Sequence, residues 1–411
     1  MAEQPARAAV ITGLGVVAPG AIGTEAFWKN TADGRPALDR ITRSGCTHLP
    51  VTVAGQIDGF DPAATIEETF LVQTDRFTHF ALAAAAWALE DARLDPAPAS
   101  PYTVGVVTAA GSGGGEFGQR ELQQLWSAGP RHVGPYQSIA WFYAAATGQI
   151  SIRGGFKGPC AVVAGDEAGG LDALAHAARL VAHGTDTVLA GAAEAPLAPY
   201  SLVCQLGYPE LSTTADPARA YAPFTTAATG YVPAEAGAML VVEAAETAAR
   251  RGAAPRALLA GHAATFTAPH RRADSRAGLA HAIRTALTAA ACAPQDIDVV
   301  FADALGTPTA DRAEAAALAD ALGPHAAEVP VTAPKTGIGR AYCAAPVLDA
   351  ATAVLAMEHR LIPPTVLPPD TTPTCDLNLI TTPRPAPIHT ALLLSRGLMG
   401  TNAALVLRHT P

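Results

Sequence analysis

The chain has 411 residues, of which 49% are apolar and only 15% are charged. This length exceeds what one hydrophobic core normally supports, so two domains or two fused halves are expected, and the composition excludes a disordered chain. The net charge of −9, with no basic run longer than Arg271-Arg272, excludes nucleic acid as a partner.

In the N-terminal part, an apolar, β-branched pattern over 8–17 predicts a buried strand. The alanine-rich segment 77–92 is apolar almost all round, which is typical of a helix packed between layers. A buried strand is expected over 103–108. A polar helical stretch over 119–126 follows the glycine-rich segment 111–118. Because glycine has no side chain, another backbone or a ligand can approach that segment closely.

The central region shows a clear change of pattern from strand to helix. A short strand is predicted over 160–164, a tight turn over 165–170, and a helix over 171–183 that Gly184 closes. A second buried strand is expected at 187–189. This order indicates that the turn lies between a strand end and a helix start.

In the C-terminal part, strands are predicted over 297–302 and 391–394, and a helix over 348–359. The proline-rich stretch 363–387 predicts a long surface connection. Strands and helices alternate through the whole chain. This alternation indicates an α/β fold with buried parallel or mixed sheets.

No apolar stretch is long enough to cross a membrane, and the first residues lack the order of a signal peptide. We therefore expect a cytoplasmic protein with no membrane partner. The six cysteines are scattered, without a CxxC pair or a histidine at ligand spacing. They predict reduced thiols and no metal site, and no cofactor is expected.

Six segments resemble the β-ketoacyl synthase family and run in the order of that family. They are VITGLGVVAPG, TDRFTHFALAAAAWALEDARLD, GPCAVVAGDEAGGLDAL, YAPFTTAATGYVPAEAGAMLVVE, PKTGIGRAYCAAPVLDAA and EHRLIPPT. The resemblance covers about residues 10–407 and implies the thiolase fold. That fold has two similar α/β halves, here expected over 1–255 and 256–411, which stack into a five-layer αβαβα sandwich and dimerise.

Condensing members of the family need a cysteine at a helix N-terminus and two histidines. Matching the motifs places Glu167 at the cysteine position, Leu305 at the first histidine and Arg340 at the second. A register shift of one residue would put Asp166 in place of Glu167, which is still a carboxylate. The family lysine remains as Lys335, for which a structural ion pair is expected. Because all three catalytic side chains are replaced, the chain resembles the chain length factor branch of the family.

Glu167 is expected to be structural. Its carboxylate would accept backbone N–H groups at the helix that begins near Gly169 or Gly170, where a helix dipole favours an anion. The resemblance places Glu167 and Arg340 in one pocket, so Arg340 is the expected ion-pair partner. Asp303 stands where the family motif has an asparagine.

The resemblance implies a heterodimer with a ketosynthase alpha subunit, which supplies the cysteine and histidines and makes most contacts with acyl carrier protein. The growing polyketide chain would run in a tunnel at the subunit interface, bounded by a helix after a GG-x-EF motif. Matching that motif selects Gly115, Phe117, Gly118 and Leu122. Small residues there imply a long product, a decaketide or longer aromatic precursor. Alternatively, these glycines only let two backbones pack closely.

Other assignments stay open at this point. A malonyl-acyl-carrier-protein decarboxylase, or another degenerate enzyme of this fold acting alone, would have to tolerate a carboxylate at 167 that repels the developing enolate. A homodimer without a ketosynthase fits the composition equally well. Cys160 lies within a predicted strand and Cys343 has no histidine close in sequence, so both are expected to be inert thiols.

Overall fold

The computed structural model describes residues 7–95, 100–268 and 275–410, so the basic pair at 271–272 lies outside the described residues. The largest sheet in the described chain is mixed and has 12 strands. Its strands are β1 (Ala9–Ala18), β2 (Ala21–Ile22), β5 (Val104–Ala109), β6 (Cys160–Val163), β7 (Thr187–Glu194), β8 (Ala236–Ala244), β9 (Ala257–Phe266), β10 (Val299–Phe301), β11 (Pro330–Thr332), β13 (Asn378–Leu379), β15 (Thr390–Arg396) and β16 (Thr401–His409).

Helices and two small sheets complete the described fold. The small sheets pair β3 (Leu38–Arg40) with β4 (Val53–Gly55), and β12 (Leu361–Ile362) with β14 (Arg384–Pro385). The α-helices are α1 (Thr24–Ala32), α2 (Glu68–Leu71), α3 (Arg76–Asp91), α4 (Gly115–Ala128), α5 (Gln137–Ala140), α6 (Ala145–Gly154), α7 (Gly169–Ala182), α8 (Pro199–Gln205), α9 (Ala245–Arg250), α10 (Arg276–Ala289), α11 (Pro308–Leu322) and α12 (Ala344–His359).

The strand order of the large sheet is repeated. Neighbouring strands run β6-β5-β7-β8-β1 in the first part and β11-β10-β15-β16-β9 in the second. In each part the first three strands are parallel and the last two are antiparallel to their neighbours. This repeat confirms the expected duplication of an α/β unit. The predicted boundary at residue 255 stays a prediction; it falls between α9 and β9, where the second copy begins.

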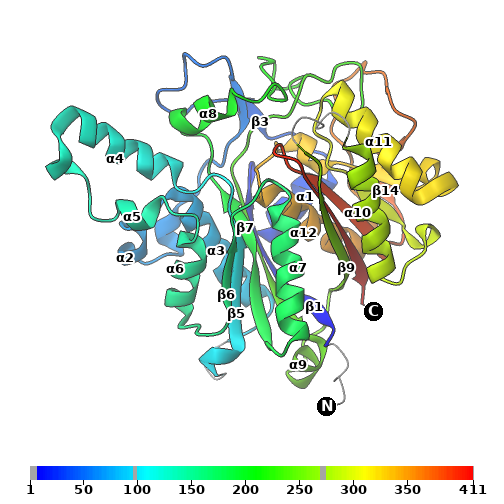
Figure 1. Ribbon diagram of the computed structural model, residues 1–411, viewed down its shortest axis with the longest axis horizontal. Helices are drawn as coiled ribbons and strands as arrows, with labels where there is room; N and C mark the ends of the chain where they lie inside the picture. Colours follow the sequence, from blue (N-terminus) through cyan, green and yellow to red (C-terminus); the bar gives the residue numbers. More distant parts are fainter. Residues whose placement is uncertain (1–6, 96–99, 269–274, 411) are drawn as a thin grey trace.

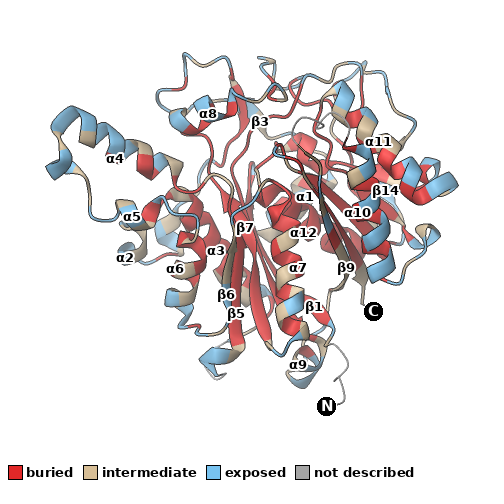
Figure 2. Ribbon diagram, viewed as in Figure 1, coloured by how far each residue is buried: buried red, intermediate tan, exposed pale blue. Residues whose placement is uncertain are grey.

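Helices separate the two halves into layers (Figure 1). α3 packs on β1 and β8, whereas α10 packs on β9 and β16. Between the halves, α7 and α12 contact each other and strands of both copies. The result is the expected five-layer αβαβα sandwich. Figure 2 shows that the sheet and the middle helices hold most of the buried residues.

Small residues make the close layers possible. A side chain at Gly170, in the first turn of α7, would lie 2.2 Å from the backbone oxygen of Cys343 at the start of α12. All residues of α12 from Ala344 to Met357 are buried, and six of them are alanine. Such packing leaves little room for larger side chains in the middle layer.

Most predicted elements are present, with shifted ends. The helix expected at 119–126 begins earlier, at Gly115, so the end of the glycine-rich segment is helical. The prediction of a plain surface connection over 363–387 is wrong in part. This segment contains β13 and β14, and Ile380 is buried. The reason is that β13 pairs with β11 at the edge of the sheet, a tertiary contact without a local signal.

α4 and α5 project from the side of the first half (Figure 1). Within the described part of the chain, no helix is both long and apolar enough to span a membrane. The cytoplasmic location expected from the sequence stays a prediction.

Candidate functional site

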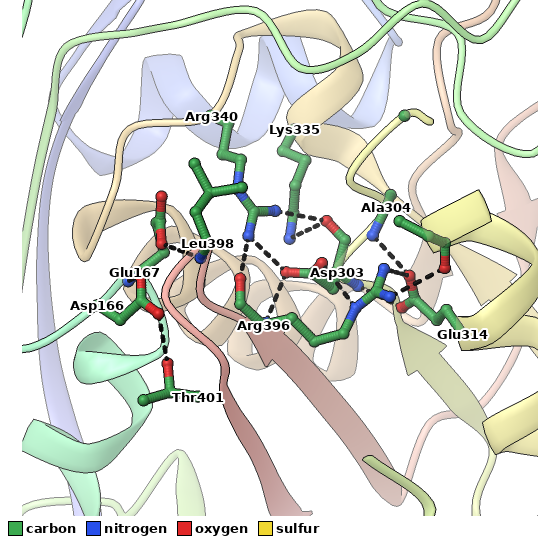
Figure 3. A network of polar contacts seen from close by, with 12 residues as sticks. Asp166, Glu167, Asp303, Ala304, Glu314, Lys335, Arg340, Arg396, Leu398 and Thr401 are labelled. Carbon is green, nitrogen blue, oxygen red and sulfur yellow. Dashed lines mark hydrogen bonds and ion pairs between the residues drawn. The ribbon is translucent and has the colours of Figure 1, made fainter. Parts of the chain in front are cut away.

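The three positions matched to catalytic side chains come together at one end of the middle layer. Glu167 precedes α7, Leu305 follows β10, and Arg340 lies shortly before α12. They are 3%, 8% and 3% exposed, respectively. Tertiary folding therefore assembles the pocket that the motifs predicted, with Glu167 and Arg340 both near the turn between β15 and β16 (Figure 3).

Arg340 forms its ion pair with Asp303. Its Nη2 atom lies 2.8 Å from Oδ1 of Asp303, and its Nη1 atom donates to the backbone oxygen of the same residue at 3.0 Å. The expected ion pair between Arg340 and Glu167 is therefore wrong. The physical reason is that Asp303, two residues after β10, has a fully buried carboxylate that requires a cation.

A second arginine binds the same carboxylate. Arg396, the last residue of β15, donates from Nε to Oδ2 of Asp303 at 3.1 Å and from Nη2 to Oε2 of Glu314 at 2.8 Å. Glu314 also accepts the backbone N–H groups of Asp303 and Ala304. Sequence reasoning missed both Arg396 and Glu314. The available signal was an arginine two residues after the apolar strand pattern 391–394; Glu314 lies in a helix with other charged residues and gave no such signal.

Lys335 forms the structural ion pair that was predicted for it. Its Nζ atom lies 2.6 Å from Oδ2 of Asp349 in α12, with both side chains almost fully buried, and it also contacts the backbone oxygen of Asp303. Burial opposes ionisation of Asp303, but the charges of Arg340, Arg396 and Lys335 outweigh it and hold the Asp303 pKa at about 2. Asp303 is thus an anion at neutral pH.

Glu167 contacts the β15–β16 turn. Its Oε2 atom accepts the Leu398 N–H at 2.8 Å, while the neighbouring Asp166 accepts the Met399 N–H at 2.6 Å and the Thr401 hydroxyl at 3.1 Å. No side chain caps the start of α7. The expectation that Glu167 accepts the first N–H groups of its own helix is therefore wrong, because its carboxyl reaches across to a turn more than 200 residues away.

The Glu167 carboxyl favours its neutral form. Burial raises its pKa well above the ordinary value, and the adjacent Asp166 carboxyl raises it further, against a smaller opposing effect of Arg340. A helix N-terminus stabilises an anion by only about 0.3–1 kcal/mol. Burying a carboxylate without a paired cation costs several kcal/mol, so burial decides the outcome. Glu167 is not poised as a nucleophile.

A cavity of about 300 Å³ opens beside Leu305. Its lining includes Thr307, Arg396 and Leu398, but neither Glu167 nor Arg340. Leu398 is only 2% exposed. The β15–β16 turn therefore keeps the degenerate nucleophile position away from the cavity.

The two cysteines considered earlier do not replace the missing thiol. Cys343 stands at the N-cap of α12, but complete burial and the nearby carboxyls of Glu194 and Glu167 raise its pKa well above the ordinary value. Its thiol therefore stays protonated and unreactive. Cys160 is exposed, at the end of β6 farthest from Glu167.

Gly115, Gly118 and Leu122 lie on the projecting helix α4. A side chain at Gly115 would first meet the Ser201 hydroxyl, at 2.3 Å. A side chain at Gly118 would meet nothing closer than Cβ of Trp141, at 3.6 Å. Leu122 is 43% exposed. Within this chain Gly118 is buried, Gly115 is half-buried and Leu122 is exposed.

Phe117 differs from the other three predicted tunnel residues. It is buried, its N–H donates to Oδ2 of Asp75 at 2.7 Å, and the Arg120 guanidinium lies 4.3 Å from its ring centre. It lines a cavity of about 270 Å³ together with Asp75 and Arg120. Phe117 therefore anchors α4 to α3, and the cavity that it lines does not include Gly118.

The match to known proteins extends over the whole chain. Residues 6–248 match the family described as beta-ketoacyl synthase, N-terminal domain, and residues 256–367 match beta-ketoacyl synthase, C-terminal domain. A provisionally named polyketide beta-ketoacyl synthase 2 of Streptomyces halstedii is 71% identical, over 98% of this chain and 97% of its own. The tetracenomycin polyketide synthase ketoacyl synthase beta subunit of Streptomyces glaucescens is 51% identical, over 97% and 98%.

Among solved structures, the ishigamide ketosynthase/chain length factor superposes with a TM-score of 0.91 and 26% identity, covering 99% of this chain and 100% of that chain. The chain belongs to the β-ketoacyl synthase family. The resemblance predicted from its motifs, including its likeness to ketosynthase beta subunits, is confirmed.

Replacing Arg340 with alanine tests the charge network. The substitution leaves the buried Asp303 carboxylate short of one cation, so the free energy of unfolding should fall by about 3–5 kcal/mol in urea titrations. Arg35 is the matched control, because its ion pair with Asp33 lies at the surface. R35A should change stability by less than about 1 kcal/mol. Equal stability of R340A and wild type would contradict the network.

Replacing Glu167 with glutamine tests its protonation. A folded-state pKa above the unfolded value of about 4.5 means that the contribution of Glu167 to the stability of wild type is largest at low pH and falls as pH rises toward the folded-state pKa. Glutamine has the same shape and cannot ionise. E167Q should therefore gain stability over wild type by about 1.4 kcal/mol per pH unit across that window. Unfolding measured from pH 5 to 8 checks this, and a gain that is independent of pH would refute it.

Proposed function

We propose that this chain is the chain length factor of a type II polyketide synthase. It pairs with a ketosynthase alpha subunit, contributes no nucleophile, and sets the length of the polyketide that the pair builds. The observation that carries this proposal is the buried charge network of Asp303, Arg340 and Arg396, which stands where a condensing enzyme holds its histidines. Contact with acyl carrier protein is expected mainly through the ketosynthase.

Independent decarboxylation of malonyl groups is not favoured. Decarboxylation needs free hydrogen-bond donors or cations aimed at the developing enolate. In this chain both Nη atoms of Arg340 already donate, to Asp303 and to the backbone oxygen of Arg396. Leu305 offers no donor in place of the first histidine. The side chains of this pocket therefore stabilise the fold and are not arranged for catalysis.

The partner surface is proposed to centre on β6 and α6. β6 ends the sheet of the first half and pairs only with β5 among the described strands. Its sequence CAVV is apolar and partly exposed. An uncovered apolar strand edge is a template for pairing with another chain. The likeness to a solved ketosynthase/chain length factor supports a ketosynthase, instead of a second copy, as the occupant.

The exposed face of α6 fits the same role. Ile152 on this helix is 67% exposed, and a side chain at Gly148, one turn earlier, would meet nothing within 4 Å. Glycine inside a helix is less stable than alanine by about 1 kcal/mol, and the packing of this chain does not require it. Close approach of a partner subunit would explain why position 148 is glycine. Trp141, Phe142 and Tyr143, just before α6, extend this surface with partly exposed rings.

The glycine at position 118 is better explained by space for the product than by close packing of two backbones. A side chain at Gly114 would lie 2.0 Å from the backbone oxygen of Ala140, so glycine is required there. At Gly118 the nearest atom would be 3.6 Å away, and alanine would fit. The helix therefore carries a destabilising glycine without a packing reason. We propose that a long polyketide, a decaketide or longer, passes where a larger side chain at 118 would otherwise extend.

The purified chain should not condense acyl groups by itself. With malonyl-loaded acyl carrier protein, carbon–carbon bond formation should appear only after the ketosynthase alpha subunit is added, because Glu167, Leu305 and Arg340 supply no nucleophile or acid–base pair. Mass spectrometry of the carrier-bound products measures this. Robust condensation without the partner would overturn the proposal.

Replacing Gly148 with phenylalanine tests the partner surface. The position is open in the isolated chain, so the subunit should fold normally, whereas affinity for the ketosynthase should fall at least about tenfold. Ala289→Phe is the control, because it adds the same ring to an exposed position of α10 in the outer layer of the other half. Titration calorimetry measures both. Unchanged affinity of G148F would place the interface elsewhere.

Gly118→Thr and Gly115→Phe should shorten the main product of the reconstituted heterodimer by at least about one extension unit, since each adds bulk at a position of α4 matched to the tunnel, beside Trp141 for residue 118 and beside Ser201 for residue 115. Gln123→Thr, on another face of α4, is the control and should not change product length. The products are compared by mass spectrometry after assembly is checked by gel filtration. Wild-type products from both assembled variants would remove this segment from the mechanism.

A further inference from the structure

The segment that faces Gly118 is held firmly against α4. The backbone oxygen of Trp141 accepts the N–H of Gly114 at 3.1 Å. The same oxygen would lie 2.7 Å from a side chain at Gly113, and the Tyr143 ring would lie 3.1 Å from it. Gly113 also has a positive φ of 60°, which glycine adopts without strain. These contacts explain Gly113 and Gly114 and fix the position of residue 141.

The side chain of Trp141 starts beside Gly118. Its Cβ is the atom nearest to where a side chain at Gly118 would begin, at 3.6 Å. The residue is nevertheless 46% exposed. Its indole contacts the rings of Phe142 and Tyr143 edge-on, with ring centres 6.4 Å apart in each pair. A large aromatic ring left exposed on a fixed backbone indicates a surface that something else covers.

We propose that Trp141 is a second determinant of product length, whose indole forms the wall beside Gly118. This inference rests on the proposed function, because it assigns a residue to the same product space. The product is a chain of alternating ketone and methylene groups. An indole suits such a chain, because its face packs on methylene groups and its N–H donates to a ketone oxygen.

On this proposal, Gly118 and Trp141 border the same space between α4 and the indole ring. A side chain added at Gly118 narrows the space between α4 and the indole, and removing the indole widens the same space. The effects of the two substitutions on product length should therefore be strongly non-additive, as expected of residues that share one cavity. Independent roles would give additive effects.

The experiment uses the reconstituted heterodimer with malonyl-loaded acyl carrier protein and compares W141A, W141F, G118T and the G118T/W141A double variant. W141A should shift the main product to a greater length by at least about one extension unit, with W141F between it and wild type. The double variant should make a product as long as that of W141A, whereas additive effects of the two substitutions would return it to the wild-type length. Trp126→Ala, the same substitution at an 83% exposed position farther along α4, is the matched control and should leave product length unchanged.

The outcomes separate this inference from the proposed function. If G118T shortens the product but assembled W141A and W141F complexes make the wild-type product, Trp141 is not a determinant and the proposed function stands. If neither Gly118 nor Trp141 variants change product length, the chain-length role of the whole segment fails. W126A acting as strongly as W141A would also overturn the assignment to Trp141. If W141A does not assemble, W141F decides by the same criteria.

Discussion

The buried Asp303 carboxylate and its two arginines are the interaction on which the rest of this site depends. Asp303 follows β10, Arg396 ends β15, and Arg340 precedes α12, so one anion connects three segments at the end of the second half. A carboxylate with no exposed surface is tolerable only when cations are adjacent. The network therefore holds in place the backbone that, in a condensing relative, would carry catalytic groups.

Two carboxyls in this pocket have opposite protonation for a simple physical reason. Asp303 faces three cations, which keep its pKa at about 2 despite burial. Glu167 is equally buried but faces Asp166, and its pKa is raised well above the ordinary value. The opposite shifts of the two pKa values come from the neighbouring charges and not from the residue type. A neutral acid at 167 and a paired cation at 340 together leave the pocket without nucleophile or base.

The residues proposed to carry the function of this chain lie on α4 and α6, and not in the pocket of Glu167 and Arg340. Gly118 and Gly148 are both helical glycines without a packing requirement inside this chain, and both lie near the partly exposed ring of Trp141 or the helix that follows it. A fold optimised only for its own stability would carry alanine at such positions. The proposed function accounts for them by what lies outside the chain, a ketosynthase against α6 and a long product beside α4.

The amino-acid sequence by itself determined the α/β class, the family, the loss of the three catalytic side chains and the ion pairing of Lys335, because these depend on local pattern and ordered motifs. Only the tertiary structure decided that Arg340 pairs with Asp303, that Arg396 joins them, and that Glu167 turns away from its own helix. Asp303 and Arg396 are 93 residues apart in sequence. Which charges meet depends on which strand ends the sheet brings together. The parallel pairing of β10 with β15 places the ends of these two strands, and so Asp303 and Arg396, next to each other.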